Sequence, residues 1–185
     1  MKTVVFPVAA GLIFMLLGKP LVAALIMSMA VIYGLRLLER RFTWQLFADG
    51  QFNRQQNLFR AHAVDITGSF LQQFANSFFA CMFWMTQGNL SLSTPAHWIT
   101  ATKTGLGAAT VLQIMLQVPR LSALMRGRWR AFVVTSLVVS SVDLCSHPGH
   151  FGGPFAEALL TGMSAYGLNL AIDATYELYL ALFKI

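Results

Sequence analysis

Six apolar runs constrain the fold of this 185-residue chain more than any other feature. They cover residues 3–17, 21–38, 61–86, 97–118, 130–145 and 154–175, and all are rich in Leu, Ala, Met and Phe. A helix needs about 20 predominantly apolar residues to cross a bilayer, so these runs predict transmembrane helices, the first being short for a span. We therefore predict an all-α, polytopic transmembrane helical bundle of about six spans, forming a single domain over residues 1–185.

The composition agrees with a surface that faces lipid. Hydrophobic residues make up 56% of the chain and charged residues only 11%, whereas a soluble domain of this length needs a more polar exterior. The net charge of +6 comes from short basic clusters between the apolar runs. Such clusters are a topology signal, so we expect the lipid bilayer as a partner and no nucleic acid.

The break at Gly18-Lys19-Pro20 decides whether residues 3–38 form one helix or a hairpin. A single helix of this length would run roughly 54 Å, far more than the hydrocarbon core of about 30 Å, which favours the hairpin. Pro95 and Pro154 open two later apolar runs as Pro20 opens the second. If these prolines mark a repeat, the six spans form three hairpins; prolines after outer turns also arise for local reasons.

The basic residues predict the orientation. Nine of the thirteen lie at the two termini or in the connections 39–60 and 119–129, and Arg36 and Arg130 lie in the adjoining ends of the apolar runs on the same side. Only Lys19 and Lys103 lie toward the other side. By the positive-inside rule, both termini and these two loops are cytoplasmic, in a multi-pass protein of the inner or plasma membrane. The segment 41–60 is either an interfacial helix broken at Gly50 or a loop folded against the bundle.

Polar side chains recur at helical spacing inside the apolar runs. The clearest stripe is Asp65, Ser69, Gln72 and Asn76, and the other runs carry Gln113 and Gln117, then Ser136, Ser140 and Asp143, and finally Glu157, Thr161 and Ser164. Polar groups inside membranes are costly and often functional, so these stripes predict a hydrophilic pathway. The alternative is that they hydrogen-bond between closely packed helices.

Three ionisable residues are predicted at similar depth near the outer surface. Lys103, Asp143 and Glu157 belong to three different apolar runs. A lysine flanked by carboxylates is either a substrate or proton site at the outer mouth of the pathway, or a structural salt bridge with a lysine that reaches toward water.

Ligand-type residues gather at the end of the fifth run. Cys145, His147 and His150 offer a thiolate and two imidazoles, which suit a divalent metal such as zinc, although their spacing matches no established zinc motif. An ordinary turn around Pro148 and Gly149 is the competing interpretation. Cys81 and Cys145 lack CxxC spacing, and we expect both to be free. No cofactor is otherwise predicted.

Two functions of different class follow. The first is an oligomeric channel or transporter for an ion or small polar solute. The second is a noncatalytic membrane subunit of a larger secretion, defence or energy-coupling assembly, in which the stripes contact partner subunits. The sequence contains no Walker loop, dinucleotide fingerprint, nucleophile elbow or haem-attachment motif, so we do not predict an enzyme.

Overall fold

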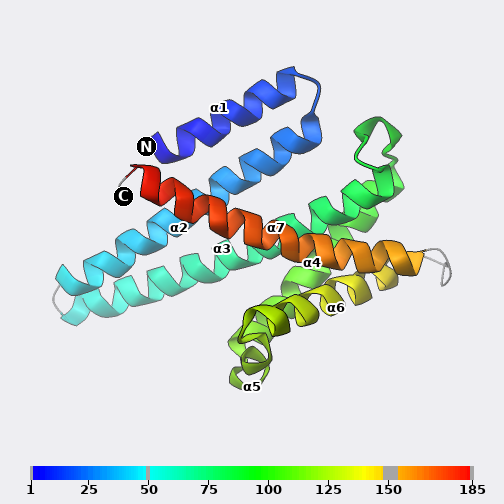
Figure 1. The fold of residues 1–185 in the computed structure, drawn as a ribbon. Helices are drawn as coiled ribbons and strands as arrows, with labels where there is room; N and C mark the ends of the chain where they lie inside the picture. The colour runs from blue at the N-terminus through cyan, green and yellow to red at the C-terminus, as the bar shows by residue number, and fades with distance from the viewer. Residues whose placement is uncertain (1, 49–50, 148–153, 184–185) are drawn as a thin grey trace. The chain divides into compact units, whose positions relative to one another are not determined.

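The computed structural model describes residues 2–48, 51–147 and 154–183, and within them the chain is helical with no strand (Figure 1). The elements in order are α1 (Lys2–Leu16), α2 (Pro20–Ala48), α3 (Gln51–Thr86), the short 3-10 turn η1 (Leu90–Leu92), α4 (Pro95–Gln117), α5 (Pro119–Ser122), the 3-10 turn η2 (Ala123–Met125), α6 (Arg128–Ser146) and α7 (Pro154–Phe183). The predicted all-α class is confirmed.

Two helices are long and apolar enough to cross a membrane. They cover Pro20–Leu46 and Arg128–Ser146, and a third span is added if α4 and the bent segment after it count as one. With 15 residues, α1 is short for a span. The long helices α3 and α7 carry internal polar side chains and are not among these candidate spans. Among the described residues, two or three helices therefore support a membrane protein. Six spans stay a prediction.

The chain divides inside α3 into two compact units, Met1–Gln72 and Gln73–Ile185. In the first unit, α1 and α2 form the predicted hairpin, and Figure 1 draws them in blue as antiparallel neighbours. Gly18 lies in the tight turn with φ of +69°, a backbone conformation that glycine adopts without steric cost. Gly11 brings the two helices close, because an added Cβ would lie 2.8 Å from the Met27 side chain.

The predicted cytoplasmic loop 39–60 is largely helical. Helix α2 continues to Ala48, and α3 begins at Gln51, so the described part of this segment is helical. Its location at the membrane interface stays a prediction. Position 50 itself lies outside the described residues. Trp44 and Phe59 are mainly exposed.

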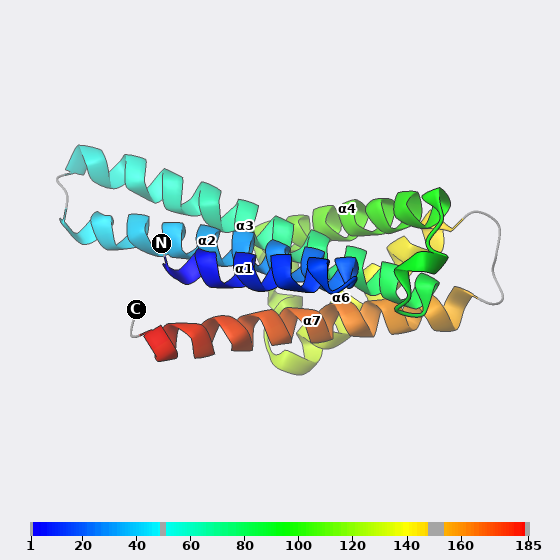
Figure 2. The same ribbon diagram turned by 90° about the horizontal axis from the view of Figure 1, so that it is seen from above.

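In the second unit, α6 packs against both α4 and α7 (Figure 2). Small side chains allow this close packing, and the buried apolar core consists of Ala80, Ala108, Leu112, Val139 and Ala165. The Tyr166 hydroxyl donates a 3.0 Å hydrogen bond to the Arg128 carbonyl, which ties the middle of α7 to the start of α6. Since α6 and α7 run antiparallel, the start of α7 lies near the end of α6.

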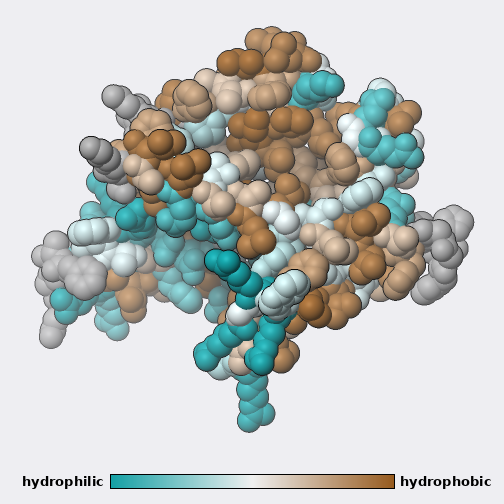
Figure 3. Space-filling view, in the orientation of Figure 1, coloured by the Kyte–Doolittle hydropathy of each residue, from teal (hydrophilic) through white to brown (hydrophobic). Residues whose placement is uncertain are grey.

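Both ends of α4 have clear local causes. Thr94 caps its first turn by accepting from the His97 backbone N–H, and Pro95 occupies the first turn. At the other end the chain bends by 100° into Pro119–Met125, because proline disfavours a helical conformation at the preceding residue, Val118. The predicted basic loop 119–129 thus contains a short helical segment. Figure 3 shows hydrophilic side chains over α5 and hydrophobic ones over α1.

Candidate functional site

Asp143 is a carboxylate buried inside the second unit. Only 1% of its surface is exposed. Its Oδ1 atom accepts a 2.8 Å hydrogen bond from the Thr104 hydroxyl of α4 and a 3.1 Å hydrogen bond from the Cys81 thiol of α3. Three helices therefore meet at one carboxyl oxygen.

The ionisable neighbours of Asp143 provide no permanent positive charge. Among the described residues the one basic group within ion-pair distance is His147, with Nδ1 3.8 Å from Oδ1. His147 also makes a 2.9 Å contact from Nδ1 to the Asp143 carbonyl oxygen, which holds the ring at the end of α6. Glu157 of α7 lies within electrostatic range of Cys81. A buried carboxylate without a lysine or arginine partner is costly when ionised, so it favours a bound cation or proton.

Buried hydroxyl groups extend the site away from His147. Ser136 and Ser140 precede Asp143 by two turns and one turn on the same face of α6. Thr161 lies on α7, and Ser77 lies one turn before Cys81 on α3. We call the full set the polar core; it comprises Ser77, Cys81, Thr104, Ser136, Ser140, Asp143 and Thr161, and all seven side chains are at least nine-tenths buried.

Four of these hydroxyls have no hydrogen-bond partner within the described part of the chain. They are the hydroxyls of Ser77, Ser136, Ser140 and Thr161. A buried polar atom without a partner costs about 1–3 kcal/mol. Elsewhere, helical hydroxyls bond to the carbonyl four residues earlier, as in Ser28, Thr43, Thr67, Thr86, Thr102, Thr110, Ser146 and Thr175. The polar core thus contains oxygen atoms available to water or a solute.

Gly162 explains why α7 approaches this face of α6 so closely. A Cβ added there would collide with the Ser136 carbonyl oxygen and the Ser140 hydroxyl. Together with the contact between Tyr166 and Arg128, this sets the register of the two helices: residue 166 lies near 128, and residue 162 lies between 136 and 140. Continuing along the antiparallel pair, Glu157 lies toward the level of Asp143.

The predicted stripe on α3 divides between exposed and buried positions. Asp65 is exposed, Ser69 is half-buried, and Gln72 and Asn76 are buried. Gln72 accepts a hydrogen bond from Arg36 of α2 in the first unit. In the second unit, Asn76 donates to the side-chain oxygen of Asn169 over 3.4 Å. The two buried members therefore contact neighbouring helices, as the packing interpretation expects.

The other predicted pathway residues differ in how far they are exposed. Lys103 and Gln117 are exposed, whereas Gln113 and Glu157 are half-buried. Thr104, next to Lys103 in sequence, is the residue of α4 that contacts Asp143. The sequence predicted Lys103 and Glu157 at the level of Asp143. In the structure the groups that contact the Asp143 carboxylate are the Thr104 hydroxyl and the Cys81 thiol.

The predicted metal ligands lie at the edge of the described structure. Cys145 is exposed, His147 is half-buried beside Asp143, and His150 lies outside the described residues. Within the ranges 2–48, 51–147 and 154–183, no group of three or more His, Cys, Asp and Glu side chains is arranged to hold a metal ion. Both cysteines are free, as expected.

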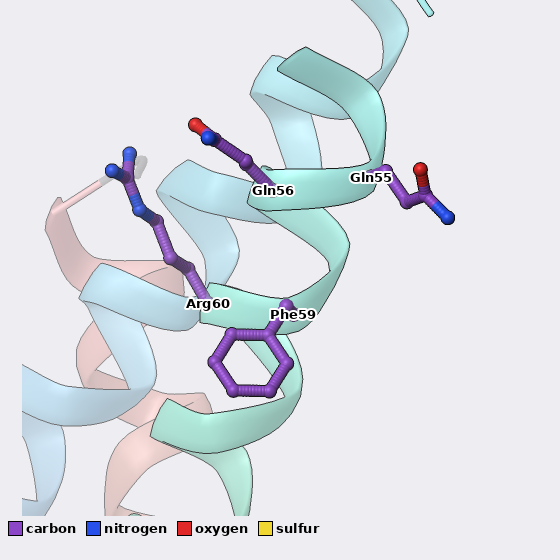
Figure 4. Close-up of a pocket in the computed structure, with 4 residues that line it drawn as sticks. All are labelled: Gln55, Gln56, Phe59 and Arg60. Atoms are coloured by element: carbon purple, nitrogen blue, oxygen red, sulfur yellow. The ribbon is translucent and has the colours of Figure 1, made fainter. Parts of the chain in front are cut away.

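Two open hollows occur in the first unit. One, of about 610 Å³, lies between α2 and α3 and includes Glu39, His62 and Asp65. The other, of about 460 Å³, is lined by Gln55, Gln56, Phe59 and Arg60, which Figure 4 shows projecting from consecutive turns of α3 alone. Since Asp65 and His62 are exposed, these hollows are surface features, and neither combines a buried charge with unpartnered polar atoms as the polar core does.

Sequence analysis identified Ser136, Ser140 and Asp143 but missed two partners of the carboxylate. Cys81 was expected only to be a free cysteine, and Thr104 was not among the predicted pathway residues. Their roles depend on the relative heights of three helices, which one sequence does not contain. The sequence did show that Ser77 and Cys81 lie one turn apart and so share a face of α3, which differs from the face of the predicted stripe.

No protein-family model, curated protein or solved structure matches this chain. The chemistry of the polar core is therefore the basis for a functional assignment.

Proposed function

We propose that this protein is a channel or transporter for an ion or small polar solute, and that the solute passes the polar core of the second unit. The single observation that carries the proposal is the buried Asp143 carboxylate, hydrogen-bonded by neutral groups and followed along α6 and α7 by hydroxyls that have no partner among the described residues. Interhelical packing alone leaves these hydroxyls unsatisfied, whereas a solute or a file of water would satisfy them.

We further propose that α1, α2, α3, α4, α6 and α7 each enter the bilayer, giving six spans with both termini in the cytoplasm of the cell. The basic residues support this orientation, since Arg120, Arg126, Arg128 and Arg130 cluster around α5 between α4 and α6. Polar side chains on α3 and α7 are compatible with spanning because partners within the bundle satisfy them, as in the contact between Asn76 and Asn169. His147 and Glu157 then lie toward the outer surface.

Flux in proteoliposomes tests the proposal. Vesicles containing the purified full chain and loaded with sodium chloride should release sodium faster than protein-free vesicles and than vesicles holding an unrelated membrane protein. A parallel series with potassium and with small neutral solutes would define the solute. Release at the rate of protein-free vesicles for every solute in the series would refute the function.

The proposal includes assembly of the chain with copies of itself, because a bundle of only six helices encloses little interior. Mass determination of the particle in mild detergent should give a multiple of the 20.4 kDa chain. Co-purification of other proteins at fixed stoichiometry would instead favour a noncatalytic subunit of a larger assembly.

A further inference from the structure

The geometry points to an alkali metal cation as the solute, held at Asp143 by the carboxylate together with the Thr104 and Ser140 hydroxyl oxygens. This inference names the solute class of the proposed transport function and rests on it. The site lies one turn before the half-buried His147 along α6.

The donor atoms favour a hard cation. Carboxylate and hydroxyl oxygens bind such ions, whereas transition metals prefer imidazole and thiolate. Thr104 donates its proton to Asp143 over 2.8 Å and retains oxygen lone pairs that are able to coordinate an ion. Ser140, one turn away on the same helix face, has no hydrogen-bond partner among the described residues. The Thr104 and Asp143 oxygens thus lie 2.8 Å apart, Ser140 shares the face of α6 that carries Asp143, and in the proposed site water completes the coordination.

The charge balance favours a monovalent ion. Asp143 provides one negative charge at the centre of the site, and its nearest ionisable neighbours are the Cys81 thiol of α3 and His147 of α6. Glu157 of α7 is half-buried and lies within electrostatic range of Cys81. A single carboxylate neutralises an alkali cation fully but leaves half of a divalent charge uncompensated.

Ser140 separates this inference from simple proton binding at Asp143. Protonation neutralises the carboxylate yet leaves the buried Ser140 and Thr161 hydroxyls without partners. A cation with its remaining water satisfies both the charge and the hydroxyl oxygens.

Ligand-dependent stabilisation of the full chain in detergent tests the site. Melting temperature is measured in increasing lithium, sodium or potassium chloride, with choline chloride keeping the ionic strength constant and calcium chloride as a further arm. We expect a saturable rise for at least one alkali chloride and none for choline. Asp143→Asn should abolish the rise, and Thr104→Val or Ser140→Ala should weaken the apparent affinity about tenfold, the effect of one lost ligand.

Thr102→Val is the matched control, because Thr102 is exposed on α4 and bonds only to the Trp98 carbonyl. It should keep the wild-type response. If Asp143→Asn does not fold, the Thr104→Val and Thr104→Ser pair decides, since serine keeps the hydroxyl. Equal responses to alkali and choline salts, stabilisation by calcium alone, or an unchanged response in Thr104→Val would each overturn the inference.

The outcomes also separate this inference from the proposed function. Solute flux without saturable alkali binding overturns the cation site and leaves transport standing. Alkali binding without flux of any solute keeps the site and removes the transport function.

Discussion

At the scale of single residues, Asp143 and Gly162 together account for the polar core of the second unit and for the close packing of α6 and α7 around it. Asp143 places a charge where no lysine or arginine among the described residues compensates it, and Gly162 lets α7 lie directly against the Ser136 carbonyl and the Ser140 hydroxyl. A larger residue at 162 would force the helices apart at the polar core. Polar chemistry and close packing therefore depend on the same short stretch of α6 and α7.

Gly162→Ala should destabilise the protein by about 1–3 kcal/mol, the usual cost of overpacking. Gly167→Ala on the same helix is the control, because an added Cβ there meets no atom within 4 Å. That control should be neutral or gain roughly 0.5–1 kcal/mol from helix propensity. Denaturant unfolding in detergent measures both variants. Equal stabilities would contradict the close approach of α6 and α7.

At the scale of elements, prolines and turn residues set most helix boundaries. Pro20, Pro95 and Pro154 each stand at the first residue of a helix, as the sequence predicted. The sequence did not decide between a helix and a loop over 41–60, because the mixture of arginine, glutamine and aromatic residues there fits an interfacial helix and a loop equally well. The bend at Val118 follows from Pro119.

Thr94 provides the clearest capping contact in the described structure. Its side chain accepts from the His97 backbone N–H, and the His97 ring accepts in return from the Thr94 backbone N–H. Thr94→Ala should cost about 1 kcal/mol and increase hydrogen exchange in the first turn of α4. Hydrogen exchange in the middle of α4 should remain unchanged in Thr94→Ala. In the control variant Thr102→Ala, exchange should remain unchanged throughout α4. Unaltered exchange at the first turn in Thr94→Ala would show that the cap contributes nothing.

Sequence patterns predicted much of the candidate site within each helix and little of it between helices. Ser136, Ser140 and Asp143 share a face by spacing alone, and all three are buried together. By contrast, Cys81 and Asp143 are 62 positions apart, and no rule of periodicity sets two helices at the same height. For the same reason, the sequence predicted Lys103 near Asp143. In the structure Lys103 is exposed, and the neighbouring residue Thr104 contacts Asp143.

At the scale of the whole molecule, the distribution of arginine makes the proposed orientation testable. The connection containing η1 should face outward, and the connection containing α5 and η2 should face the cytoplasm. Leu92 and Leu124 are exposed side chains in these two connections, so both positions are accessible to labelling. Cys81 is fully buried, and only the exposed Cys145 must be removed beforehand.

In a Cys145→Ser background, Leu92→Cys should react with a membrane-impermeant maleimide in intact cells or spheroplasts. Leu124→Cys should react only after the membrane is permeabilised, and the background protein should stay unlabelled throughout. The reverse labelling pattern would show that the proposed orientation is inverted. Labelling of both cysteines from one side would contradict the proposed membrane crossing between positions 92 and 124.

We propose that the solute passes Asp143. A comparison of sodium flux between the wild type and matched variants tests this claim. Asp143→Asn and Thr102→Val are reconstituted at equal protein density and compared with the wild type in the same sodium release assay. We predict that Asp143→Asn lowers the rate about tenfold or more, since the charge at the centre of the path is lost, and that Thr102→Val retains the wild-type rate. Wild-type flux in Asp143→Asn would contradict the claim.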